Sequence, residues 1–365
     1  MKRIVVCCDG TWNTADQADE NGRPCPTNVV RLAYRVAKHD AAGVTQVVYY
    51  DQGVGTGNWV DKVSGGAIGA GLEDNIHDAY RFLIANYERG DELFVFGFSR
   101  GAFTARSLVG MVRKCGILAA KHVLHYHEAV ELYRNEAHPD DPGPTDFRAR
   151  YCVYGNDDIE VRFVGVWDTV GALGIPVRGL RLMKQKYQFH DTELSGIVKE
   201  AVQALAIDEH RAPFKPAIWE DRKKAWQTVE QVWFCGAHSD VGGGYGRKPA
   251  GEGKLAPQLA DLSLDWMVAK AQAAGLAFDR ETLEANPLTL DPRAEIHNSK
   301  TGLYWLVPEY DRVIGLATFD KELTDKPDTT QKLHPSVLAR WDAEAKYRPE
   351  ALVRYLRRIG DRRAD

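Results

Sequence analysis

Long apolar runs are missing from this 365-residue sequence. None approaches the ~20 consecutive apolar residues that a membrane-spanning helix requires. The apolar run at residues 4–8 is also too short for a secretory signal peptide. We therefore expect a cytoplasmic protein without an integral membrane segment. Export by a secretion machine that ignores signal peptides would leave no mark in such a sequence.

An excess of one charge is missing as well. The 47 lysines and arginines nearly balance the 51 aspartates and glutamates, and the formal net charge is -4. Domains that bind nucleic acid normally present a strongly basic surface, so we expect no nucleic-acid partner. The arginines near the C-terminus are better explained by a solvated helix end. The composition leaves the oligomeric state open.

Cysteines are few, and their spacing is not that of metal ligands. The 6 cysteines include no C-x-x-C pair, so we interpret them as buried, reduced residues. A solvated helix face is the better explanation for His122, His125 and His127. A hydrolytic metal site built from Asp9, Asp51 and Asp240 is an alternative, but hydrogen bonding explains these residues equally well. We expect neither a metal nor a cofactor.

The sequence does contain a regular alternation of strand and helix patterns. Short apolar runs at residues 4–8, 46–50 and 92–98 are each followed by apolar residues at helical spacing, over residues 28–38, 72–87 and 100–114. Further strands are predicted at 161–166 and 229–235, and further helices at 194–207 and 259–274. This alternation favours one α/β domain over residues 1–365, with a mostly parallel central sheet and helices on both faces.

The most informative motif is G-x-S-x-G at residues 97–101. It joins a predicted strand directly to a predicted helix, which is the setting of a sharp turn that exposes a nucleophilic serine. Such a turn strains the backbone at Ser99, and side chains at positions 97 and 101 would clash; Gly97 and Gly101 avoid both clashes. We interpret Ser99 as the nucleophile. A glycine-flanked turn without chemistry is the alternative.

Two other predicted strands end in the groups that such a serine needs. Asp168 follows the strand at 161–166, and His238 follows the strand at 229–235. Functional groups gather at the carboxyl ends of parallel strands, and the order Ser, Asp, His is that of the α/β-hydrolases. We therefore predict a catalytic triad of Ser99, Asp168 and His238. Separately, Asp168 could be a turn residue and His238 a core histidine.

Acyl transfer also requires donors for a developing oxyanion. We expect one at the amide of Arg100, which follows the nucleophile. The second is expected in the loop after the first strand, at the amide of Gly10 or Thr11. Substrate-binding residues are expected at Trp12, Leu173 and Ile175.

Two irregular segments, residues 119–158 and 171–195, interrupt the alternation. Both follow elements that carry triad residues, so we expect them to form a lid at the catalytic face, above Ser99. The alternative is that their apolar residues only anchor long loops to the core.

Several motifs together resemble one family, the α/β-hydrolases typified by the catalytic domain of type VI secretion phospholipase effectors. The resemblance covers about residues 1–250 and rests on CDGTWN (8–13), YDQGVGT (50–56), GFSRGAFTAR (97–106), VWDTVG (166–171) and HSDVGGGY (238–245), with LHPSV (333–337) similar to the family's C-terminal part. It implies an α/β-hydrolase-like fold with lid insertions and assigns the family's serine, aspartate and histidine to Ser99, Asp168 and His238. It also implies a carboxylic ester hydrolase that acts on lipid or phospholipid acyl esters through an acyl-enzyme, with transient contact to a membrane surface.

Two other functions are weighed against this one. The string Asp9-Gly10-Thr11 is similar to the Asp-x-Asp-Gly-Thr motif of haloacid-dehalogenase-type phosphatases. Their nucleophilic aspartate would fall on Cys7, so a metal-dependent phosphatase is disfavoured. The other alternative is a hydrolase-like scaffold kept for binding or export. A serine-reactive fluorophosphonate probe would label Ser99 of an enzyme but not Ser99 of such a scaffold.

Overall fold

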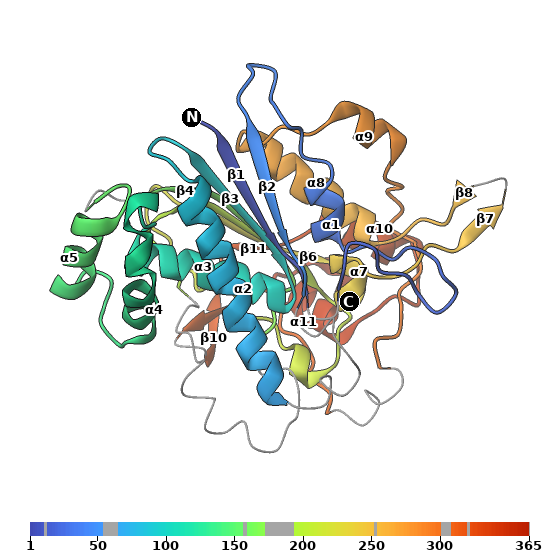
Figure 1. Ribbon diagram of the computed structural model, residues 1–365. Helices are drawn as coiled ribbons and strands as arrows, with labels where there is room; N and C mark the ends of the chain where they lie inside the picture. Colours follow the sequence, from blue (N-terminus) through green and yellow to red (C-terminus); the bar gives the residue numbers. More distant parts are fainter. Residues whose placement is uncertain are drawn as a thin grey trace.

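The computed structural model describes residues 1–10, 13–53, 65–155, 159–171, 193–251, 254–300, 308–319 and 322–364, with residues 65–70, 254 and 364 described by their backbone alone. Figure 1 shows a central sheet with helices packed on both of its faces. Within the described ranges, no helix combines the length and the apolar character needed to span a membrane.

The central sheet has seven strands in the order β11-β6-β5-β4-β3-β1-β2, and every neighbouring pair is parallel. This confirms the predicted parallel sheet. Its strands are β1 (Arg3–Cys8), β2 (Gln46–Asp51), β3 (Glu92–Phe98), β4 (Val161–Trp167), β5 (Val198–Ala206), β6 (Thr228–Phe234) and β11 (Gln331–Leu333). Because all strands point the same way, their carboxyl ends meet at one edge.

Successive residues of the central strands alternate between two cores, one on each face of the sheet. In β1, Val5 and Cys7 belong to one core, whereas Ile4 and Val6 belong to the other. The first core is covered by α1 (Asn28–Ala33), α8 (Ala260–Ala273), α10 (Pro335–Ala343) and α11 (Glu350–Arg358), and the second by α2 (Gly65–Asn86) and α3 (Arg100–Cys115). Burial on both faces explains why these strands are continuous apolar runs.

The segment at residues 119–158 packs on the outer side of α2 and α3. It forms η2 (Ala120–His125), α4 (Tyr126–Arg134) and α5 (Pro142–Tyr151). The Tyr133 hydroxyl donates to the carbonyl of Ser107 at 3.1 Å, and Arg148 donates to the carbonyl of Lys114 at 2.9 Å. Ser99 directly precedes the first residue of α3, whereas the contacts with α4 and α5 are made further along this helix. Figure 1 shows α4 and α5 to one side of α2 and α3. These contacts support the alternative that this segment's aromatic residues serve as anchors rather than as a lid. The second predicted lid segment lies almost wholly outside the described residues.

The remaining elements surround the carboxyl edge or lie on the periphery. They are η3 (Ala212–Phe214), α7 (His238–Gly242), α9 (Arg280–Ala285), η5 (Arg362–Ala364), the antiparallel pair β7 (Pro249–Gly251) and β8 (Lys254–Leu255), and the antiparallel pair β9 (Leu316–Phe319) and β10 (Glu322–Pro327).

One predicted element was wrong: the helix expected at residues 194–207 is absent, and Val198–Ala206 form β5 instead. The segment is rich in alanine, which favours a helix locally, but it lies between β4 and β6 in the middle of the sheet. Gln203 is fully buried there, and its side chain is bonded to Thr169 and Gln231. Sheet packing therefore overrides the local helix propensity.

Candidate active site

The candidate site lies where the direction of the sheet's connections reverses. The chain passes outward from β1 to β2 and then returns to β3 on the other side of β1. In parallel sheets, this reversal leaves a crevice at the carboxyl ends of the two strands. Gly10 follows β1 and Ser99 follows β3, and a Cβ atom added to Gly10 would lie 3.2 Å from the Cβ of Ser99. The two loops are thus in direct contact.

Ser99 has the strained backbone that the G-x-S-x-G motif predicts. Its φ is 59° and its ψ is -122°, a conformation that side-chain-bearing residues seldom adopt. The flanking glycines make this turn sterically feasible. A Cβ on Gly97 would lie 2.5 Å from the carbonyl oxygen of Gly101, and one on Gly101 would lie 2.2 Å from the carbonyl oxygen of Cys8. The turn therefore requires glycine at both positions.

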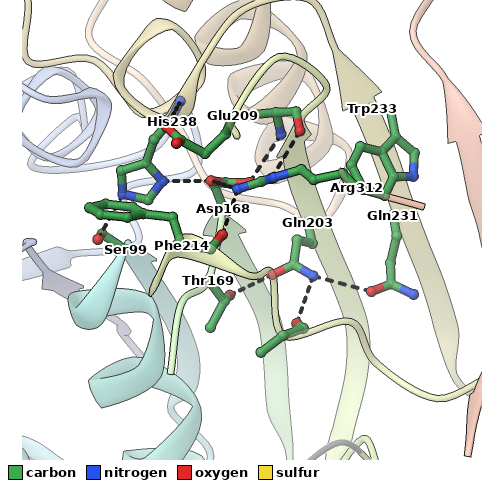
Figure 2. Close-up of polar contacts among 12 residues, drawn as sticks. Ser99, Asp168, Thr169, Gln203, Glu209, Phe214, Gln231, Trp233, His238 and Arg312 are labelled. Carbon is green, nitrogen blue, oxygen red and sulfur yellow. Dashed lines mark hydrogen bonds and ion pairs between the residues drawn. The ribbon is translucent and has the colours of Figure 1, made fainter. Parts of the chain in front are cut away.

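His238 lies between Ser99 and Asp168, as Figure 2 shows. Its Nε2 is 2.8 Å from the Ser99 hydroxyl oxygen, and its Nδ1 is 2.5 Å from Asp168 Oδ2. All three residues are buried. The carboxylate accepts the Nδ1 proton, which leaves Nε2 unprotonated and facing the serine hydroxyl. The three residues predicted from separate strand ends are brought into hydrogen-bond contact.

The Asp168 carboxylate accepts further hydrogen bonds besides the one from His238. Its Oδ1 accepts the amide of Ala206 at 3.0 Å, and Arg312 donates to Oδ1 at 2.5 Å and to Oδ2 at 2.9 Å. Burial would raise the pKa of Asp168, but the charge of Arg312 and the bonds from His238 outweigh it and hold that pKa well below its usual range. Arg312 was not predicted from the sequence.

Apolar rings and a second ion pair surround His238. The ring of Phe98 lies 4.6 Å from the imidazole, and that of Phe214 lies 4.9 Å away. The backbone amide of His238 donates to Glu209 at 3.3 Å, and Glu209 pairs with Arg211. Burial lowers the pKa of His238, although Asp168 and Glu209 raise it, so the imidazole is neutral near pH 7.

The predicted oxyanion donors differ in their surroundings. Arg100 is the first residue of α3, so its amide is one of the four that a helix leaves without an intrahelical acceptor. The amide of Gly10 donates to Asp9 Oδ1 at 2.7 Å and is therefore engaged within its own loop. Burial raises the pKa of Asp9 to about 6, despite its bonds from Thr27 and Tyr50.

Four predicted site residues lie outside the described ranges. They are the alternative oxyanion donor Thr11 and the expected substrate-binding residues Trp12, Leu173 and Ile175.

The structure also gives the contacts of another histidine, His334, and of Asp240, one of the carboxylates weighed as a metal ligand. His334 caps α10 by accepting the amide of Ser336, whereas His238 contacts the serine. Asp240 accepts the amide of Ala237 and a bond from His297. In the part of the chain that the structure describes, no three or more His, Cys, Asp or Glu side chains are grouped so that they could hold a metal ion.

A comparison with protein families identifies one family for this chain. Residues 2–270 match the family model described as T6SS, phospholipase effector Tle1-like, catalytic domain. The uncharacterized protein YEL023C of Saccharomyces cerevisiae is 27% identical over 235 residues, which are 59% of this chain and 32% of that protein. The chain thus spans about a third of the length of this curated relative.

Two solved structures are more distant. The Tle1 effector bound to the VgrG spike of the type 6 secretion system is 17% identical, with a TM-score of 0.46 over 79% of this chain and 76% of that one. An uncharacterized protein from Pseudomonas aeruginosa is 17% identical, with a TM-score of 0.44 over 79% of this chain and 49% of that one.

Proposed function

The chain belongs to the family of Tle1-like catalytic domains of type VI secretion phospholipase effectors, and from this we propose that it is a serine hydrolase that cleaves lipid acyl esters. The observation that supports this proposal most is the buried series of contacts from Ser99 through His238 to Asp168. The serine, the histidine and the carboxylate are the partners that nucleophilic attack by a serine requires.

The first half of the proposed reaction forms an acyl-enzyme. The Ser99 hydroxyl attacks the ester carbonyl while His238 Nε2 takes its proton, and Asp168 stabilises the resulting imidazolium. His238 then returns the proton to the departing alcohol oxygen. The alcohol leaves, and the acyl group remains bonded to Ser99. The amide of Arg100 at the start of α3 is proposed as one donor to the oxyanion.

The second half releases the fatty acid. Water attacks the acyl-enzyme, His238 takes a proton from it, and the oxyanion donor stabilises the second tetrahedral intermediate. The bond between the acyl carbon and the Ser99 oxygen then breaks, and His238 returns the proton to Ser99. With a diacyl phospholipid, this route yields a free fatty acid and a lysophospholipid. The phosphate stays on the glycerol in this chemistry, which separates it from cleavage of a phosphodiester.

The experiment that tests the function measures both products. Phosphatidylcholine and phosphatidylglycerol vesicles, and aryl esters of increasing acyl length, are incubated with the protein, and fatty acid and phosphate-containing products are quantified. Ser99→Ala should lower fatty-acid release by about 10⁴-fold or more. Ser107→Ala, in the same helix and also buried, is the matched control and should retain activity.

A fluorophosphonate probe gives an independent readout that needs no substrate. It should label the wild-type protein and the Ser107→Ala variant but not Ser99→Ala. If the folded wild-type protein releases no fatty acid from any ester and is not labelled, the non-catalytic scaffold is the correct interpretation. Release of a phosphorylated head group instead of a fatty acid would also overturn the proposal.

Delivery by type VI secretion is proposed on family membership alone. Loss of the protein from culture medium when the secretion apparatus is inactivated would support it, and unchanged release would contradict it.

A further inference from the structure

Arg312 is a buried, charged neighbour of Asp168. It follows the segment matched by the family model, and it is 1% exposed. Its two terminal nitrogens bond both oxygens of Asp168, and they also donate to the carbonyls of Ala206 at 2.9 Å and Phe214 at 2.8 Å. Figure 2 shows the guanidinium reaching Asp168 from the side opposite His238. Both oxygens of the Asp168 carboxylate are therefore held by hydrogen bonds, which fixes its orientation.

The charges around His238 form two pairs. Asp168 is paired with Arg312, and Glu209 is paired with Arg211 at 2.8 Å. Among the described residues, Ser99 and the uncharged rings of Phe98 and Phe214 also contact the imidazole. Asp240, two residues further along α7, is paired with His297. The charges of Asp168, Arg312, Glu209 and Arg211 cancel one another when His238 is neutral, and protonation of His238 adds a positive charge to this group.

We propose that Arg312 is a positioning residue of this site: it orients the Asp168 carboxylate toward His238 and offsets the charge of that carboxylate. The inference rests on the proposed function only for its effect on catalysis, because the effect on His238 can be measured without substrate. It assigns a role to the part of the chain beyond residue 270, which the family model does not cover.

The direction in which Arg312 changes the pKa of His238 follows from its charge. A carboxylate alone stabilises an imidazolium, whereas a guanidinium beside it opposes that effect. Arg312 thus disfavours protonation of His238 by charge, and burial of the imidazole acts in the same direction. Removing the charge of Arg312 should raise the pKa of His238. The neutral base would then be lost at a higher pH, and the acidic limb of the activity profile would move upward.

Arg312 also supports the apolar wall of the site. Its bond to the Phe214 carbonyl holds η3 against the imidazole, and its bond to the Ala206 carbonyl ties it to the end of β5. A lysine at this position would keep the charge but lose the two-pronged contact. Comparison of a lysine with a neutral residue therefore separates charge from geometry.

The test follows the protonation of His238 directly. The ¹H–¹³C signal of its Cε1 is titrated against pH in the wild-type protein and in Arg312→Met, Arg312→Gln and Arg312→Lys, with His238→Gln used to assign the signal. The midpoint should move up by about one pH unit or more in the Met and Gln variants, and much less in the Lys variant. Arg312→Gln keeps a donor beside Asp168 and serves where Arg312→Met does not fold.

A matched control removes another buried arginine from the same region. Arg340 donates to the carbonyls of Pro292 and Ala294, away from the triad, so Arg340→Met should leave the midpoint unchanged. An unchanged His238 midpoint in folded Arg312→Met or Arg312→Gln would overturn the inference, and so would an equal rise in Arg340→Met.

The pH profile of kcat/KM distinguishes the inference from the function on which it rests. In an active protein, the acidic limb of Arg312→Gln should move with the His238 midpoint, while Arg312→Lys should keep the wild-type limb at a lower maximum. If the wild-type protein shows no Ser99-dependent hydrolysis, the proposed function fails, and the NMR titration still decides the inference. If it is active and the limb of Arg312→Gln stays in place, the inference alone fails.

Discussion

Gly101→Ala is a sharp test of the turn that presents Ser99. Gly101 is the second residue of α3, and it packs against the end of β1. An added Cβ would lie 2.2 Å from the carbonyl oxygen of Cys8 and 2.4 Å from that of Asp9. Both are backbone atoms of a buried strand end, so neither can rotate away. The start of α3 must shift by about 1 Å to restore ordinary contact.

The expected effects follow from that shift. Forcing one methyl group into a packed core destabilises a protein by about 1–3 kcal/mol. The shift also displaces Ser99, whose hydroxyl oxygen is 2.8 Å from His238 Nε2. A displacement of about 1 Å at a reacting group lowers the rate on the order of 100-fold. A 100-fold loss corresponds to about 2.7 kcal/mol of activation free energy, so we expect catalysis and stability to fall by similar amounts.

Urea unfolding and kcat/KM on a short-chain ester measure the two effects separately. Gly143→Ala is the matched control, because Gly143 is the second residue of α5 and an added Cβ there meets nothing within 4 Å. That variant should match the wild type in activity and equal or exceed it in stability. The reasoning is refuted if Gly101→Ala unfolds within about 0.5 kcal/mol of the wild type and keeps kcat/KM within about twofold.

Four further predictions concern the same chemistry. Asp168→Asn should lower kcat by about 10³–10⁴-fold, because the amide no longer holds the required tautomer of His238; a loss below about tenfold would contradict it. His238→Ala should abolish activity, whereas His334→Ala should lose only about 1 kcal/mol of stability with its helix cap; the reverse result would identify the other histidine as the base. Because burial lowers the pKa of His238, activity should rise with pH through a midpoint below the usual ~6.5; a midpoint above 7 in the pH–rate profile would oppose this. Exhaustive chelation should leave ester hydrolysis unchanged, and recovery by added calcium or magnesium after a loss would support a metal site instead.

The features that the sequence predicted well are those with a local cause. The strand β3 is a continuous apolar run because both of its faces are buried, and the glycines around Ser99 are required by atoms within a few ångströms. Asp168 and His238 could be located because each follows a strand whose direction was already predicted. The parallel sheet then brings its strand ends to one edge, and these three side chains meet there.

The features that were missed depend on which distant residues become neighbours. The segment of β5 has a local preference for helix, and only its place between β4 and β6 makes it a strand. At the oxyanion site, the glycine after β1 was identified, but the direction of its amide depends on Asp9. That carboxylate competes for the same proton donor, and composition alone does not reveal the outcome.

Arg312 shows this limit most clearly. It lies 144 residues from Asp168 along the chain, in a segment without a recognisable motif, and nothing near it in sequence distinguishes it from the other arginines. Its importance comes from the fold, which leaves Asp168 fully buried and in need of a compensating charge. A buried carboxylate predicted at a strand end therefore implies that some cation or set of donors must reach it. The tertiary structure identifies Arg312 as the residue that meets this requirement.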